Sequence, residues 1–216
     1  MHKKFTLLIC SYNPNKKWLA QAIKSVQGIF DEYILVDDGS KEPIVCPNNF
    51  TLLRQNNGGL WTARNLGINN ATGDIICLLD DDDWLDGEEV KKMCKFVEDN
   101  YDNGDIFTHD FYVHRDTGEV SIRKSGYCIE KILEKNQYVG TTWYKKSVWE
   151  KLGGYSDAIA EDWDFWMRAI KNGLKIIEYG GVFYHYRKRK GSVSFDWVGD
   201  KFLEIKQDIN NRYYNK

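Results

Sequence analysis

Four consecutive aspartates, residues 80–83, directly follow the apolar segment 75–79. Such a segment is typical of a buried strand, so the carboxylates should emerge at its carboxyl end, where open α/β sheets bind ligands. Adjacent carboxylates raise one another's pKa unless a cation relieves the repulsion, and Mg²⁺ or Mn²⁺ on one or two carboxylates takes substrate phosphates as further ligands. In an extended chain Asp80 and Asp82 point the same way. The pattern favours a metal–phosphate site on these two over a solvated acidic turn.

A second acidic pair, Glu161 and Asp162, precedes a predicted helix over residues 163–171. Carboxylates are favourable in a first helical turn because they complement the helix dipole and cap free N–H groups. Trp163 and Trp166 would also place an apolar wall beside these acids, which raises a carboxylate's pKa and suits it to act as a general base. Capping and base catalysis both fit the pattern.

Two further segments could contact an anion. Asn57-Gly58-Gly59 opens a predicted helix over residues 60–69 that carries Arg64. Glycines at a helix start let backbone N–H groups approach an anion, and Arg64 could add a charge-assisted contact. The basic segment 187–190, which runs into Gly191-Ser192-Val193-Ser194, would either be a solvated face or neutralise a leaving group.

The elements that would position these residues alternate between strand and helix in the first half of the chain. This alternation predicts βαβ units and an α/β fold with a mainly parallel sheet. The second half predicts a hairpin, a short strand, two helices, and two strands separated by Gly180-Gly181. The predicted strands are 5–10, 33–36, 51–54, 75–79, 106–113, 120–123, 141–144, 175–179 and 182–186, and the predicted helices are 18–26, 60–69, 88–97, 147–152 and 163–171. The tail carries apolar residues at helical spacing, which favours docking on the domain over binding a membrane surface or a partner.

Composition narrows the class of protein. The chain has 216 residues and a net charge of −2, so it lacks the basic field of a nucleic-acid-binding protein. No apolar run approaches the 18 or more residues that a membrane span needs, and no export signal is visible. Five cysteines without a C-x-x-C spacing fit reduced thiols, so we expect a cytoplasmic location.

Taken in order, the motifs resemble those of the family 2 glycosyltransferases, which are inverting, nucleotide-sugar-dependent enzymes of the GT-A fold. The resemblance covers residues 5 to about 195, and no single motif decides it. The motifs are Ser11-Tyr12-Asn13, Val36-Asp37-Asp38-Gly39-Ser40, Asn57-Gly58-Gly59 with Ala63-Arg64-Asn65-Leu66-Gly67, Thr72-Gly73-Asp74, Leu79-Asp80 to Trp84, Gly153-Gly154-Tyr155, Glu161-Asp162-Trp163-Asp164-Phe165-Trp166, and Tyr186-Arg187 before Ser192-Val193-Ser194.

The resemblance implies one GT-A (Rossmann-like) domain over residues 1–216, with a core at about 5–195 and a helical tail at about 196–216. It also implies site residues. Tyr12 and Asp38 would hold the nucleobase with Arg64 nearby, and Asp80-x-Asp82 would be the metal motif, with Asp82 the direct ligand of Mn²⁺ or Mg²⁺. Asp81 or Asp80 would lie close to the ribose or to waters on the metal. Asp162 would be the general base.

The activity implied is transfer of a hexosyl or N-acetylhexosaminyl group from a nucleotide-diphosphate sugar, with a UDP-sugar expected, to an acceptor hydroxyl with inversion. The acceptor would be a saccharide or a lipid-linked saccharide in surface polysaccharide or glycan assembly, and a lipid-linked one would be met peripherally at the inner face of the membrane. Cys10 and Trp61 depart from the family pattern, so nucleobase and sugar contacts could differ. A nucleotidyltransferase acting on sugar phosphates and a non-catalytic nucleotide- or sugar-binding module are the alternatives. The first would need a glycine-rich basic loop after the first strand, and Ser11-Tyr12-Asn13-Pro14-Asn15 has no glycine.

Overall fold

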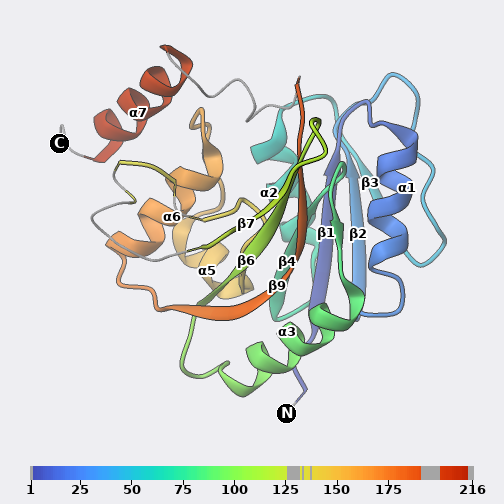
Figure 1. The fold of residues 1–216 in the computed structure, drawn as a ribbon, viewed down its shortest axis with the longest axis horizontal. Helices are drawn as coiled ribbons and strands as arrows, with labels where there is room; N and C mark the ends of the chain where they lie inside the picture. The colour runs from blue at the N-terminus through green and yellow to red at the C-terminus, as the bar shows by residue number, and fades with distance from the viewer. Residues whose placement is uncertain (1, 126–131, 133, 137, 191–199, 214–216) are drawn as a thin grey trace.

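The computed structural model describes residues 2–125, 132, 134–136, 138–190 and 200–213 (Figure 1). Its strands are β1 (Phe5–Ser11), β2 (Glu32–Asp37), β3 (Thr51–Arg54), β4 (Ile75–Asp80), β5 (Trp84–Leu85), β6 (Ile106–Arg115), β7 (Val120–Arg123), β8 (Trp143–Lys145) and β9 (Ile176–Lys188). Its helices are α1 (Lys16–Ser25), α2 (Leu60–Asn70), α3 (Gly87–Asp99), α5 (Lys146–Leu152), α6 (Glu161–Lys171) and α7 (Asp200–Tyr213).

The described strands form one sheet in the order β3-β2-β1-β4-β8-β6-β9-β5, with β7 paired to β6. β1 is parallel to β2 and β4, and β2 is parallel to β3. β8 is antiparallel to both β4 and β6, so β6 and its parallel neighbour β9 run with the first four strands. β5 pairs antiparallel with β9, and β7 pairs antiparallel with β6. The predicted α/β fold with a mainly parallel sheet is therefore confirmed.

Helices cover both faces of this sheet, which is why its central strands β1, β2 and β4 are mostly apolar. Leu7 and Ile9 of β1 pack into a cluster with residues of α1 and α3, whereas Leu8 packs into a second cluster with α2, α5, α6 and α7. Side chains on a strand alternate between faces, so one strand contributes to both cores. β4 likewise contributes to both clusters, so its carboxyl end emerges from a strand that is buried on both faces.

β9 differs from its prediction. The sequence predicted two strands separated by Gly180-Gly181, but the structure has a single strand, Ile176–Lys188. Tyr179 pairs with His109 and Val182 with the next residue, Asp110, so the two glycines are extra residues on β9. Glycine is common at such bulges, where one strand bends without breaking. The sequence predicted a turn at Gly180-Gly181 because glycines are typical of turns and of bulges alike.

The tail helix α7 docks on α6, as the spacing of its apolar residues predicted; Figure 1 shows the two helices on the same side of the sheet. Ile205 and Ile209 are fully buried, and the Phe202 ring stacks 6.4 Å from that of Trp163. The Tyr213 hydroxyl donates to the carbonyl and the carboxylate of Asp164. Among the described residues no helix is long and apolar enough to cross a membrane.

Candidate active site

The turns after β1, β2 and β4 meet at one edge of the sheet, as predicted. The Ser11 hydroxyl at the end of β1 donates to the Asp81 carboxylate, and the Asp38 N–H donates to the Ser11 carbonyl at 2.9 Å. The Asn13 N–H donates to the Ser40 hydroxyl at 2.9 Å. Because the three strands are parallel neighbours, their carboxyl ends bring together residues that lie up to 70 positions apart in the chain.

The acidic run, residues 80–83, is a turn and not an extended segment. β4 ends at Asp80, and the Asp83 N–H returns to the Asp80 carbonyl at 3.2 Å. The predicted alternation of side chains therefore stops at the end of the strand, and each carboxylate meets a different partner. Asp80 pairs with Arg64 at 3.5 Å, Asp81 accepts from Ser11, Asp82 pairs with Arg189 at 3.0 Å, and Asp83 accepts from the Tyr184 hydroxyl and, at 2.6 Å, from the Arg187 N–H.

The four aspartates differ in exposure, and burial raises the pKa of three of them. Asp83 is fully buried, burial raises its pKa well above the ordinary value, and its bonds fasten the run to β9. Asp80 and Asp82 keep 38% and 19% of their side chains exposed, so an incoming ligand can reach them. Burial and neighbouring carboxylates raise the pKa of Asp81 to about 6, and burial raises that of Asp80 to about 6 against the opposing effect of Arg64.

Arg64 lies beneath the site as a buried link between two acidic segments. Its side chain is 4% exposed, Nη1 donates to Glu161 Oε1 at 2.8 Å, and Nη2 lies 3.5 Å from Asp80 Oδ1. The guanidinium carbon is 5.4 Å from the centre of the Tyr155 ring. Burial raises the pKa of Glu161 to about 7, and Arg64 opposes this shift. The sequence placed Arg64 near the donor; the structure brings it to the carboxylates of β4 and α6.

Asp162 lies beside Glu161 in the first turn of α6, with a different set of partners. Its Oδ2 accepts from Asn136 Nδ2 at 2.9 Å, and its Oδ1 accepts from the Trp163 N–H at 2.7 Å. Burial raises its pKa, against the opposing effect of Arg64. A Cβ atom on Gly140 would lie only 3.2 Å from Oδ2, so that glycine allows the chain to pass close to the carboxylate. The third acid, Asp164, is buried and accepts from Ser156, Arg168 and Tyr213.

Asp38 and Tyr12 occupy different environments at the end of the sheet. Asp38 is 4% exposed, and its carboxylate accepts from Gln55 Nε2 at 2.7 Å and from the N–H groups of Gly58 and Gly59 at 2.9 and 3.0 Å. It therefore holds the glycine turn that begins α2, in which Gly59 has a φ of 90°. Tyr12 is 50% exposed. A nucleobase contact from either residue stays a prediction.

The sequence did not single out two residues that complete the site. Trp18, in the first turn of α1, has the guanidinium carbons of Arg187 and Arg189 at 4.8 and 4.6 Å from its ring centre. The sequence feature that could have indicated Trp18 is a large aromatic residue outside the buried apolar face of α1, which is formed by Leu19, Ala22 and Ile23. Asn136, which donates to Asp162, lies in a segment with no recognisable periodicity. The part of the predicted basic loop from residue 191 onward lies outside the described residues.

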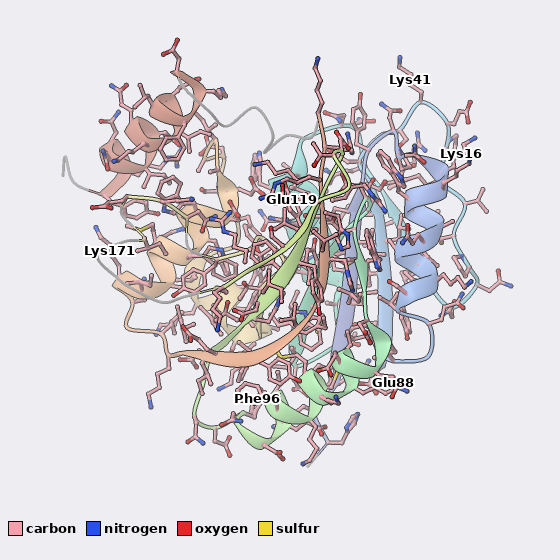
Figure 2. The ribbon with its side chains drawn as sticks, viewed as in Figure 1. Lys16, Lys41, Glu88, Phe96, Glu119 and Lys171 are labelled. Atoms are coloured by element: carbon pink, nitrogen blue, oxygen red, sulfur yellow. The ribbon has the colours of Figure 1, made fainter. Side chains whose placement is uncertain are left out.

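A cavity of about 920 Å³ lies between α1 and the segment 41–47, away from this chemistry. Lys16 and Lys41, labelled in Figure 2, are among the residues that line it, together with Leu19, Ile23 and Val45. None of the carboxylates described above lines it. The site is therefore defined by the side chains at the carboxyl end of the sheet and not by this cavity.

The structure thus brings carboxylates at the end of β4 and an acidic pair at the start of α6 together around the buried Arg64. The family model described as "Glycosyl transferase family 2" matches residues 6–162. This chain belongs to glycosyltransferase family 2.

Curated relatives and a solved structure agree with this assignment. The chain is 27% identical to glycosyltransferase GlyA of Streptococcus pneumoniae over 90% of its own length and 32% of GlyA. It is 29% identical to the minor teichoic acid biosynthesis protein GgaA of Bacillus subtilis over 97% of its length and 55% of GgaA. The crystal structure of S. aureus TarS 1–349 in complex with UDP-GlcNAc has a TM-score of 0.72 at 20% identity, covering 96% of this chain and 66% of TarS 1–349, and it supports the GT-A-type fold. The chain thus spans about a third to two thirds of these proteins.

Proposed function

We propose that this glycosyltransferase moves a hexosyl or N-acetylhexosaminyl group from a UDP-sugar to an acceptor hydroxyl with inversion, using Mn²⁺ or Mg²⁺. The observation that carries the proposal is the position of Arg64, whose guanidinium contacts Asp80 on one side and Glu161, next to Asp162, on the other. One side chain thus joins Asp80, proposed for the metal and donor, to Glu161, the neighbour of the proposed base. The UDP-GlcNAc complex of TarS supports the choice of a uridine nucleotide.

The carboxylates fit Mn²⁺ or Mg²⁺ as a shared ligand of protein and donor. Asp80 and Asp82 are partly exposed. The Asp82 carboxylate already pairs with a positive charge, the Arg189 guanidinium. Among the described residues no group of three or more His, Cys, Asp or Glu side chains is arranged to hold a metal ion. A hard cation needs no such group when it is held by one or two carboxylates and completes its shell with phosphates and water. When bound, the ion supplies positive charge to the departing nucleoside diphosphate.

The chain's own residues would supply orientation and proton transfer. Asp162 would accept the proton of the acceptor hydroxyl as that oxygen attacks the anomeric carbon from the side opposite the diphosphate. Its raised pKa favours proton uptake, and the bond from Asn136 fixes the carboxylate's orientation. Glu161, held by Arg64, would keep the first turn of α6 in place. Attack from the opposite face in one step inverts the anomeric centre.

We further propose a saccharide or lipid-linked saccharide as the acceptor, in assembly of a surface polysaccharide on the cytoplasmic side of the membrane. The relationship to GgaA, named for minor teichoic acid biosynthesis, supports this class of pathway.

The proposed function is tested by calorimetric titration of UDP with and without Mn²⁺, followed by product analysis with UDP-sugars. Asp82→Asn should remove the Mn²⁺-dependent part of UDP binding, because Asp82 is the expected metal ligand. Asp99→Asn, which alters an acid paired only on the surface of α3, is the matched control and should bind as the unmutated protein does. Mn²⁺-independent binding of UDP by the unmutated chain would contradict the metal site. Release of pyrophosphate from UTP and a sugar phosphate would indicate a nucleotidyltransferase instead.

A further inference from the structure

Two arginines at the end of β9, Arg187 and Arg189, contact the acidic run in different ways. Arg187 is fixed: its N–H donates to Asp83, its Nη1 donates to the Asp82 carbonyl, and its Nη2 donates to Gln21 Oε1 at 3.0 Å. Arg189 instead contacts a carboxylate that the proposed function needs, because its Nη2 lies 3.0 Å from Asp82 Oδ2. Only the second contact would have to change when a metal binds.

A guanidinium and a metal ion compete for the Asp82 carboxylate. Mn²⁺ or Mg²⁺ would lie about 2.1 Å from the oxygen it binds. A guanidinium nitrogen 3.0 Å from that oxygen would then face a divalent cation at close range, in a site where the Arg189 and Asp82 side chains are only 26% and 19% exposed. Like charges at such a separation repel strongly where water is partly excluded. Binding of the metal therefore favours departure of Arg189.

Trp18 gives Arg189 a surface on which to move. The Arg189 guanidinium lies over the indole ring, 4.6 Å from its centre, and stacking of this kind tolerates sliding across the ring face better than a directional hydrogen bond does. Asn15 caps α1 by accepting from the Lys17 and Trp18 N–H groups, so the helix end that carries the ring is fixed. Arg189 can therefore leave Asp82 without losing its aromatic contact.

We propose that Arg189 occupies Asp82 in the metal-free protein and passes to the donor's diphosphate when metal and donor bind. This inference rests on the proposed function. The diphosphate on the same metal is the nearest new anion for the displaced guanidinium, and arginine pairs well with phosphate oxygens. Arg189 then weakens binding of metal alone and strengthens binding of the nucleoside diphosphate with metal, so that the two ligands enter together.

The experiment compares Arg189→Gln with Lys190→Gln, which removes a neighbouring, solvent-exposed positive charge. The affinity for Mn²⁺ without nucleotide is measured by electron paramagnetic resonance of the free ion, and the affinity for UDP at saturating Mn²⁺ by calorimetry. Arg189→Gln should bind Mn²⁺ alone about three- to tenfold more tightly, the range expected for loss of one partly buried ion pair, and should bind UDP with Mn²⁺ more weakly by a similar factor. Lys190→Gln should change neither affinity by more than about twofold. Arg189→Lys should recover part of the UDP affinity.

The opposite signs of the two changes distinguish this role from a structural one. In an Asp82→Asn background, Arg189→Gln should no longer alter Mn²⁺ binding, because the carboxylate for which the two cations compete is gone. Unchanged or weaker Mn²⁺ binding by Arg189→Gln, or unchanged UDP binding, would overturn the proposal. If the unmutated chain binds UDP equally with and without Mn²⁺, the proposed function fails. If it shows metal-dependent binding and Arg189→Gln behaves like Lys190→Gln, only the role of Arg189 fails.

Discussion

Replacing Arg64 with methionine should destabilise the protein by an amount that depends on pH. Arg64 is 4% exposed, donates to Glu161 at 2.8 Å and lies 3.5 Å from Asp80. Methionine fills much of the same space but brings neither charge nor donor. Removing one partner of a buried ion pair costs roughly 3–5 kcal/mol, because the other charge stays buried without compensation. The full cost applies only where Glu161 is ionised.

The direction of the pH dependence follows from the pKa of Glu161, which burial raises from 4.5 to about 7 in the folded protein. Between these values the folded state binds more protons than the unfolded chain, so the free energy of unfolding falls as pH rises through this window. Loss of Arg64 raises the pKa further, since its charge opposes the shift. We expect the substitution to cost roughly 3–5 kcal/mol near pH 8.5. Near pH 5.5 a neutral Glu161 loses only a hydrogen-bond partner, which costs roughly 1–2 kcal/mol.

Urea unfolding at the two pH values measures this difference, and Arg54→Met is the matched control. Arg54 Nη1 lies 2.5 Å from Asp37 Oδ2 at the same edge of the sheet. Burial of Asp37 is outweighed by hydrogen bonds from Ser40 and Ile44 and by the charge of Arg54, so its pKa is lowered and it is ionised at both pH values. The cost of Arg54→Met should not change with pH. Equal costs for Arg64→Met at both values, or a larger cost at the lower pH, would refute the reasoning.

Two further predictions concern α7 and the proposed base. Ile209→Ala should lower the free energy of unfolding by about 2–4 kcal/mol, because Ile209 is fully buried against the second core; Leu203→Ala on the same helix, 61% exposed, should have little effect in the same urea titration. Equal effects would mean that α7 is not docked in solution. Asp162→Asn should slow sugar transfer by roughly 10²–10⁴-fold while leaving UDP affinity nearly unchanged. Near-normal transfer rates in that variant would exclude Asp162 as the base.

The sequence predicted the centre of the sheet well because β1, β2 and β4 are buried on both faces. Continuous apolar segments such as 75–79 need no knowledge of distant partners to be recognised as strands, and the turns that follow them must meet at one edge of a parallel sheet. Prediction failed where a local pattern has two structural meanings. Gly180-Gly181 is compatible with a turn and with a bulge, and only the pairing of Tyr179 and Val182 with adjacent residues of β6 decides between them.

Contacts within the site were harder to predict for a related reason. The sequence places Arg64 one turn into α2 but carries no local sign that Glu161, 97 positions later, is its partner. Asn136 belongs to no periodic element, so nothing in its neighbourhood indicated a bond to Asp162. The side chains of the acidic run were expected to alternate because the strand was extrapolated past Asp80. The bond from the Asp83 N–H to the Asp80 carbonyl closes a turn instead and gives each carboxylate its own partner.

The three acids of the first turn of α6 are not equivalent candidates for the base. Asp164 is paired with Arg168 at 2.8 Å and accepts from Ser156 and Tyr213 as well, so protonating it would break several bonds inside the core. Glu161 is paired with Arg64 at 2.8 Å, so taking up the acceptor's proton would cost it that buried ion pair. Asp162 forms no ion pair with any residue that the structure describes, while its neutral partner Asn136 keeps it oriented. Asp162 is therefore the acid of this turn whose carboxylate is oriented by a neutral donor and not by a paired cation, and burial raises its pKa, which together make it the candidate for the base.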